Sequence, residues 1–206
     1  MIATLPNILT LSRIVAIPAI IVTFYIEGPQ AQWAALAIFV AAGITDFLDG
    51  YFARTRGQFS KLGQFLDPVA DKLLIAAVIL MLVAVDRITG VTVLAAVVIL
   101  CREIMVSGLR EFLAEIKVGL PVTRLAKWKT TVQMIAIAIL LVGGALPFPF
   151  PVIEIGIVGL WAAAVLTLIT GYDYLRAGLR HMAAEDRAAE NRATGARTPP
   201  AAEDRA

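Results

Sequence analysis

Thr45–Leu74 reads TDFLDGYFARTRGQFSKLGQFLDPVADKLL and lies between two long apolar stretches. It brings four aspartates into an otherwise hydrophobic part of the chain: Asp46, Asp49, Asp67 and Asp71. An ionised aspartate near the centre of a bilayer costs roughly 2.5–3.5 kcal/mol on insertion scales. Four of them need a compensating partner, and a divalent metal ion is the simplest one. The stretch therefore predicts a polar, metal-binding site inside a membrane protein.

The composition of the chain excludes several other classes of protein. At 206 residues, 59% hydrophobic and with a mean hydropathy of +0.82, it is not a soluble globular domain. The net charge of +2 gives no reason to expect a nucleic-acid partner. The single cysteine, Cys101, and the single histidine, His181, exclude a disulfide framework and a Cys/His zinc site.

Each pair of aspartates falls on one face of an expected helix. Asp46 and Asp49 are spaced i, i+3, and Asp67 and Asp71 are spaced i, i+4. Only eight residues, Thr55–Leu62, join the two segments, so we expect antiparallel neighbouring helices with facing carboxylates. An all-oxygen ligand set suits Mg²⁺ or Mn²⁺, as one ion or as the two that are common in phosphoryl chemistry.

Small and basic residues accompany the aspartates. Gly50 and Gly63 leave room for a ligand beside the carboxylates. Arg54, one turn after Gly50, can offer a bidentate fork to a phosphate. Simpler alternatives exist: Gly50 as a helix-packing residue, Arg54 as a topology charge, and Asp67 followed by Pro68 as the start of a helix.

Six apolar segments are long enough, or nearly so, to cross about 30 Å of hydrocarbon. We expect helices over 8–26, 32–54, 64–85, 90–113, 125–146 and 151–175, because backbone groups in lipid must bond internally. This predicts an all-α membrane protein with six transmembrane helices and a polar cavity facing the cytoplasm. Residues 1–180 would form one transmembrane catalytic domain, and 181–206, which are Ala-rich and of mixed charge, a flexible cytoplasmic tail.

The basic residues predict the orientation of these helices. Most of them lie in the second and fourth connections and toward the C-terminus, whereas Arg87 is nearly alone on the other side. By the positive-inside rule, we expect the aspartates and both termini on the cytoplasmic side of the cell membrane.

The complete pattern from Asp46 to Asp71 is D-x2-D-G-x2-A-R-x8-G-x3-D-x3-D. It resembles the signature of the CDP-alcohol phosphatidyltransferases, without any departure from their spacing. The resemblance covers about residues 5–180 and includes PNILTLSR (6–13), REIMVSGLREFLAE (102–115) and AKWKTTVQM (126–134). These stretches are similar to bacterial members that transfer the phosphatidyl group of CDP-diacylglycerol to sn-glycerol 3-phosphate and release CMP. The resemblance implies a multi-pass protein of the bacterial inner membrane, in contact with membrane lipid, and a homodimer.

The resemblance also implies roles for individual residues. The four aspartates would hold the divalent metal, and the last of them, Asp71, would be the general base. The CDP-diacylglycerol site would include Asn7, Thr10, Arg13, Gly50, Ala53, Arg54, Ser60 and Gly63. By their residue types alone, Asn7 could equally be a helix cap and Arg13 an interface anchor.

The phosphate of the acceptor requires a second basic pocket, for which the candidates are Arg102, Arg110, Lys127 and Lys129. Arg102 lies within an apolar run and is the costliest of them, so it is the first candidate. Glu103 beside it could be only a partner charge. Lys127 and Lys129 could equally be topology residues or contacts with anionic lipid.

Other functions share parts of this pattern. The signature names only the CDP-linked donor, so inositol phosphate, serine, phosphatidylglycerol and CDP-choline-type reactions stay open. Intramembrane prenyltransferases also use aspartate-rich Mg²⁺ sites, but without the glycine and arginine elements. A cation transporter would favour internal repeats, and the sequence shows none.

Overall fold

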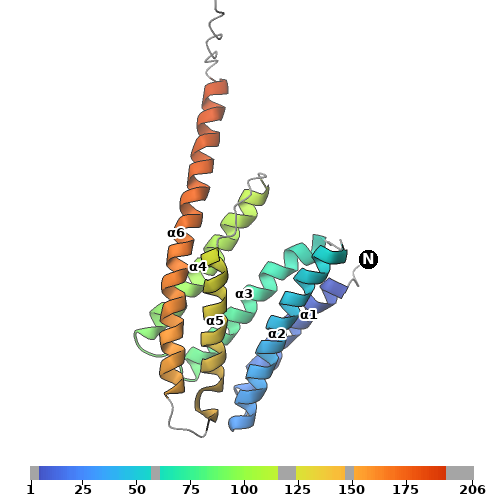
Figure 1. The fold of residues 1–206 in the computed structure, drawn as a ribbon, viewed down its shortest axis with the longest axis vertical. Coiled ribbons are helices and arrows are strands. Elements are labelled where there is room, and N and C mark those ends of the chain that lie inside the picture. The colour runs from blue at the N-terminus through green and yellow to red at the C-terminus, as the bar shows by residue number, and fades with distance from the viewer. Residues whose placement is uncertain (1–4, 57–60, 116–123, 147–150, 194–206) are drawn as a thin grey trace, which may run out of the picture.

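The computed structural model describes residues 5–56, 61–115, 124–146 and 151–193, and these residues are helical almost throughout. The helices are α1 (Leu5–Thr23), α2 (Pro29–Arg56), α3 (Lys61–Ala84), α4 (Thr92–Glu115), α5 (Arg124–Val142) and α6 (Val152–Ala193), with a short 3-10 turn, η1 (Gly143–Ala145), after α5. The expected all-α class with six helices is confirmed (Figure 1). Helix α6 continues to Ala193, and the domain boundary at 180 stays a prediction.

Four helices contain stretches long and apolar enough to cross a membrane: Pro29–Tyr51, Thr92–Ala114, Leu125–Ala145 and Val152–Arg180. The described apolar part of α1, Asn7–Thr23, is shorter. Helix α3 carries Asp67, Asp71 and Lys72 in its first half, which lowers its hydropathy. The sequence thus predicted all six helices, but two of them are less membrane-like in length or composition than we expected.

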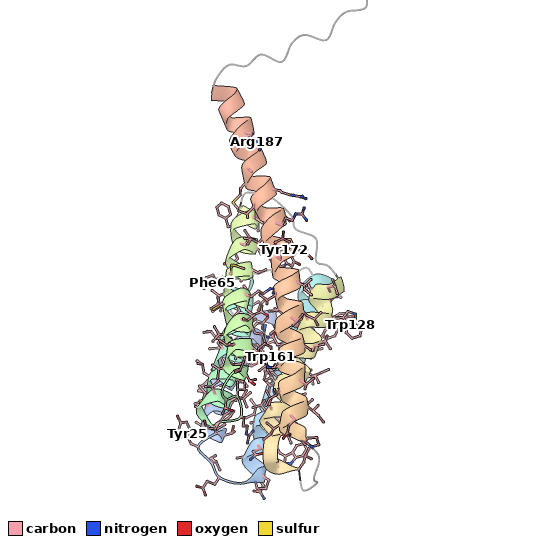
Figure 2. The ribbon with its side chains drawn as sticks, turned by 90° about the vertical axis from the view of Figure 1, so that its left-hand side faces the viewer. Tyr25, Phe65, Trp128, Trp161, Tyr172 and Arg187 are labelled. Carbon is pink, nitrogen blue, oxygen red and sulfur yellow. The ribbon has the colours of Figure 1, made fainter. Side chains whose placement is uncertain are left out.

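The outer surface of the bundle carries many exposed apolar side chains. Figure 2 shows Tyr25 toward the lower end and Phe65 and Trp128 higher up, and all three are exposed. Such a surface would promote aggregation in water, whereas lipid chains solvate it in a bilayer. The surface therefore fits a membrane protein.

Helix α1 packs against both α2 and α3, while α6 packs against α4 and α5. In the described residues α2 and α3, which we expected to be neighbours, make little direct contact, and α1 packs against both of them instead. Figure 1 shows them diverging from the end where the chain passes from one to the other. Both helices present aspartates to the same region, and α1 brings the guanidinium of Arg13 among them.

Close packing fixes the other half of the bundle. A Cβ on Gly156 would lie 2.7 Å from Leu140, and one on Gly159 would lie 2.9 Å from the Cβ of Ala136. The lack of side chains at these two positions of α6 lets α5 approach closely, as is common between membrane helices.

Arg87 connects the end of α3 to the end of α5, on the side of the bundle opposite the aspartates. Helix α3 ends at Ala84, Asp86 follows with a left-handed φ of 57°, and the N–H of Arg87 bonds back to the carbonyl of Leu82 at 3.0 Å. The Arg87 guanidinium donates to the carbonyl of Leu140 at 2.9 Å and to that of Leu141 at 2.5 Å. It therefore caps the C-terminal end of α5, where a positive charge is favoured.

Candidate active site

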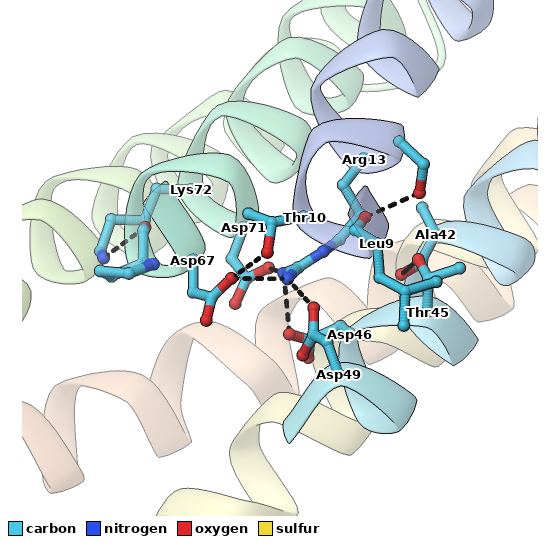
Figure 3. A network of polar contacts seen from close by, with 12 residues as sticks. Leu9, Thr10, Arg13, Ala42, Thr45, Asp46, Asp49, Asp67, Asp71 and Lys72 are labelled. Carbon is cyan, nitrogen blue, oxygen red and sulfur yellow. Dashed lines mark hydrogen bonds and ion pairs between the residues drawn. The ribbon is translucent and has the colours of Figure 1, made fainter. Parts of the chain in front are cut away.

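The four aspartates meet at the guanidinium of Arg13 (Figure 3). Arg13 comes from α1, Asp46 and Asp49 from α2, and Asp67 and Asp71 from α3. Its Nη1 lies 2.8 Å from Asp46 Oδ1 and is paired with Asp71, while its Nη2 lies 3.2 Å from Asp67 Oδ1 and is paired with Asp49. Three helices thus bring the four predicted metal ligands to one point.

The two sides of this cluster differ in exposure. The side chain of Arg13 is fully buried and that of Asp49 is 4% exposed. The side chains of Asp46, Asp67 and Asp71 are 42–48% exposed. Arg13 therefore lies on the buried side of the cluster, and the carboxylates of Asp46, Asp67 and Asp71 are accessible from the other side.

A polar stripe along α1 holds this arrangement. Asn7, Thr10 and Arg13 recur every three residues on a mostly apolar helix, and all three are buried. The Thr10 hydroxyl donates to Asp67 Oδ1, the same oxygen that faces Arg13. The structure thus brings two of the three predicted residues of α1, Thr10 and Arg13, into contact with the aspartates. What the sequence did not reveal is that Arg13 contacts all four of them, because those contacts span 33 to 58 positions of the chain.

The simplest alternatives for two of these residues are wrong. Asp67 does not begin a helix, because α3 already begins at Lys61 and Pro68 lies inside it. Arg13 is not an exposed interface anchor, because its side chain is buried.

The chemistry of the donor set fits a divalent cation. Carboxylate oxygens without nitrogen or sulfur are what Mg²⁺ and Mn²⁺ prefer. No three acidic, histidine or cysteine residues of the described chain are spaced as a ready-made metal cage. The four carboxylates instead converge on one cationic group, the guanidinium of Arg13.

The remaining predicted donor-site residues are only partly described. Gly50 follows Asp49 on α2 and is half-buried, and Gly63 is buried in the first turn of α3. The side chains of Ala53 and Arg54, and the whole of Ser60, lie outside the described residues. Their proposed contacts with the donor stay predictions.

The candidate acceptor residues divide into a buried and an exposed pair. Arg102 on α4 and Lys129 on α5 are buried, whereas Arg110 and Lys127 are exposed. Glu103 joins the buried pair: Lys129 Nζ donates to its Oε1, and Arg102 Nη1 lies 3.7 Å from its Oε2. The structure thus assembles two of the four candidates around a carboxylate.

Helix α6 completes this second polar cluster. Arg102 Nη2 donates to Thr170 Oγ1 at 2.9 Å, and its guanidinium carbon lies 6.0 Å from the centre of the Tyr174 ring. A Cβ on Gly171 would lie 3.0 Å from Arg102 Cγ, so the glycine makes room for the arginine. Sequence reasoning missed Thr170 and Tyr174, the two α6 residues that contact Arg102. Their signal was the presence of two hydroxyl groups one helical turn apart on a largely apolar segment.

Fold and site together define a class: a helical membrane protein whose polar site consists of four aspartates from two helices around one cation. The CDP-alcohol phosphatidyltransferase family model matches residues 3–169. A CDP-diacylglycerol–glycerol-3-phosphate 3-phosphatidyltransferase of Rickettsia bellii is 49% identical over 173 residues, which are 84% of this chain and 94% of that protein. A cardiolipin synthase (CMP-forming) of Oryza sativa subsp. japonica is 39% identical over 84% of this chain and 56% of that protein.

A solved structure has the same fold. The phosphatidylinositol phosphate synthase of Mycobacterium tuberculosis, in its apo form, superposes with a TM-score of 0.62 at 21% identity, over 84% of this chain and 88% of that one. The chain belongs to the CDP-alcohol phosphatidyltransferase family. Members of this family generally depend on a divalent metal.

Proposed function

We propose that this protein transfers the phosphatidyl group of CDP-diacylglycerol to sn-glycerol 3-phosphate, giving phosphatidylglycerophosphate and CMP. The observation that carries the proposal is the meeting of all four signature aspartates at one point, in a chain 49% identical to a protein named for this reaction. The 49% identity extends over nearly all of that relative, so the comparison concerns whole proteins.

In this proposal Asp46, Asp49, Asp67 and Asp71 hold one or two Mg²⁺ or Mn²⁺ ions. When bound there, such a metal would supply positive charge for the pyrophosphate of the donor and for the charge that develops on departing CMP. The exposure of the Asp46, Asp67 and Asp71 side chains supports entry of the metal and the phosphates from that side. Gly50, Ala53, Arg54, Ser60 and Gly63 are proposed to contact the nucleotide and its phosphates, together with the polar stripe of α1.

Asp71 is the proposed general base. It accepts the proton of the glycerol hydroxyl as that oxygen attacks the β-phosphorus of CDP-diacylglycerol. A new phosphorus–oxygen bond forms to the acceptor, the phosphorus–oxygen bond to CMP breaks, and CMP leaves with the electron pair. Both substrates must be held in line for this displacement, which requires a separate cationic site for the acceptor.

Arg102, Arg110, Lys127 and Lys129 are the proposed acceptor site. The exposed pair is accessible to an incoming phosphate, and the buried pair is held by Glu103 and α6. A phosphate dianion is the ligand that such a group of guanidinium and ammonium groups recognises.

The proposed orientation places the aspartates and both termini on the cytoplasmic side of the bacterial inner membrane. Its support is the distribution of basic residues and the location of Arg87, which follows the C-terminal end of α3, whereas Asp67 and Asp71 lie in the first half of that helix. A homodimer is proposed from the resemblance to the family.

The decisive experiment measures CMP release by the purified protein in detergent, with CDP-diacylglycerol, Mg²⁺ and one acceptor at a time. Turnover with sn-glycerol 3-phosphate alone is the expected result. Turnover with phosphatidylglycerol, inositol phosphate or serine instead would keep the aspartate chemistry and overturn the acceptor. No release of CMP with any acceptor would overturn the proposed reaction as a whole.

A further inference from the structure

We propose that Arg13 and the divalent metal occupy the aspartate cluster in alternation. In the metal-free protein the Arg13 guanidinium is the internal counter-ion of the four carboxylates, and metal binding displaces it. The inference rests on the proposed role of the four aspartates as metal ligands.

The charges of the cluster favour replacement of the guanidinium. Arg13 is paired with four carboxylates, and one guanidinium neutralises only one of four negative charges. Divalent ions entering from the accessible side would neutralise more of that charge. Because like charges at short range repel, a metal at the carboxylates and a guanidinium among them disfavour each other.

The surroundings of Arg13 also leave one of its hydrogen-bond donors unsatisfied in the described structure. Its Nη1 and Nη2 atoms face carboxylates, but its Nε is buried and has no hydrogen-bond partner in the described structure. An unpaired buried donor carries a free-energy penalty, which is relieved when the side chain moves to a place where Nε is bonded. The counter-ion is therefore held by its charge rather than by a complete set of hydrogen bonds.

The proposed chemistry requires the same movement. Arg13 donates to Asp71, the proposed general base, and this carboxylate must be free of the guanidinium to accept a substrate proton. Thr10 keeps α1 attached to Asp67 through a separate hydrogen bond. A displaced Arg13 would therefore stay beside the cluster, where its planar fork suits an oxygen of the donor phosphates.

The test is metal binding without substrates. Mn²⁺ is titrated into the purified full-length protein in detergent, and free Mn²⁺ is followed by electron paramagnetic resonance. Arg13→Gln should bind Mn²⁺ more tightly than the unchanged protein by at least about tenfold, because it removes a competing charge a few ångströms away. The matched control is Arg87→Gln, which removes a partly buried arginine at the other end of the bundle and should leave the Mn²⁺ affinity unchanged.

A melting measurement in the same samples gives a second readout. Without metal, Arg13→Gln should melt at a lower temperature than the unchanged protein, and saturating Mn²⁺ should close most of that gap. Equal or weaker Mn²⁺ binding by Arg13→Gln would overturn the inference and make Arg13 part of the loaded site. Absence of Mn²⁺ binding in both proteins would overturn the proposed metal site as well.

If Arg13→Gln does not fold, amide hydrogen exchange in the unchanged protein tests the alternation instead. Arg13 links α1 to α2 and α3 only in the metal-free arrangement, so Mn²⁺ should speed amide exchange around residues 7–13 of α1. Unchanged or slower exchange there would overturn the alternation.

Discussion

Glu103→Gln should destabilise the protein more than removal of its partner, Lys129→Met. The carboxylate of Glu103 accepts from Lys129 and lies 3.7 Å from Arg102, so it is the shared counter-ion of two buried cations. Each substitution breaks the same ion pair, but the groups left behind differ in their access to water.

The exposed fractions set the magnitude. The side chain of Lys129 is only 4% exposed, and without Glu103 it keeps a charge with no carboxylate partner among the described residues. This costs about 3 kcal/mol, the lower end for a broken buried pair. Without Lys129, Glu103 is still 24% exposed and retains Arg102, so the cost is about 1 kcal/mol. The double variant removes both charges, and its cost should be smaller than the sum of the single costs by at least about 1 kcal/mol.

The assay is reversible unfolding in mixed micelles by titration with a denaturing detergent, followed by circular dichroism. Glu111→Gln is the matched control, because Glu111 is an exposed glutamate of the same helix whose carboxylate accepts only from Ser107 in the described contacts. That control should change the free energy of unfolding by less than about 0.5 kcal/mol. A smaller loss for Glu103→Gln than for Lys129→Met, or strict additivity in the double variant, would refute the reasoning.

Three further outcomes follow from the aspartates and from the close packing of α5 and α6. Asp71→Asn should abolish CMP release while CDP-diacylglycerol still binds in an equilibrium assay; near-normal turnover would remove Asp71 from the role of base. Asp46→Asn and Asp67→Asn should each raise the Mg²⁺ concentration for half-maximal activity by at least about tenfold. Even changes to residues that only hydrogen-bond to metal ligands weaken metal binding by about this factor. Gly156→Ala should lower the free energy of unfolding by about 1–3 kcal/mol, because the added Cβ would lie 2.7 Å from Leu140. Gly144→Ala is the control and should leave the free energy of unfolding unchanged, because a Cβ at Gly144 would have open space around it.

The fold could be predicted from the sequence to a large extent. The apolar segments predicted six helices, and the class and the family are confirmed. Segment length and hydrophobicity are local properties that lipid converts directly into helices, because the backbone has no other way to satisfy its hydrogen bonds. The boundaries were less accurate; α1, for example, ends at Thr23, whereas we expected it to reach residue 26.

The assembly of the site could be predicted only in part. The spacing of the aspartates predicted one carboxylate face on each of two helices, and these faces do converge. The sequence did not predict that α1 would lie between those helices, because side-chain spacing within a helix carries no information about which helix packs against it. For the same reason the pairing of Glu103 with Lys129, which joins positions 26 residues apart, had to come from the structure.

The sequence by itself determined that this chain is a six-helix membrane protein of its family, and it selected four aspartates as the centre of the chemistry. Only the tertiary structure decided that those carboxylates share one buried arginine, and that two of the four candidate acceptor cations are buried around a glutamate. The physical reason is the range of the interactions. Hydrophobic runs and helical spacing act over a few neighbouring residues, whereas a buried charge is paired with whatever group the packing of distant helices brings within about 3 Å.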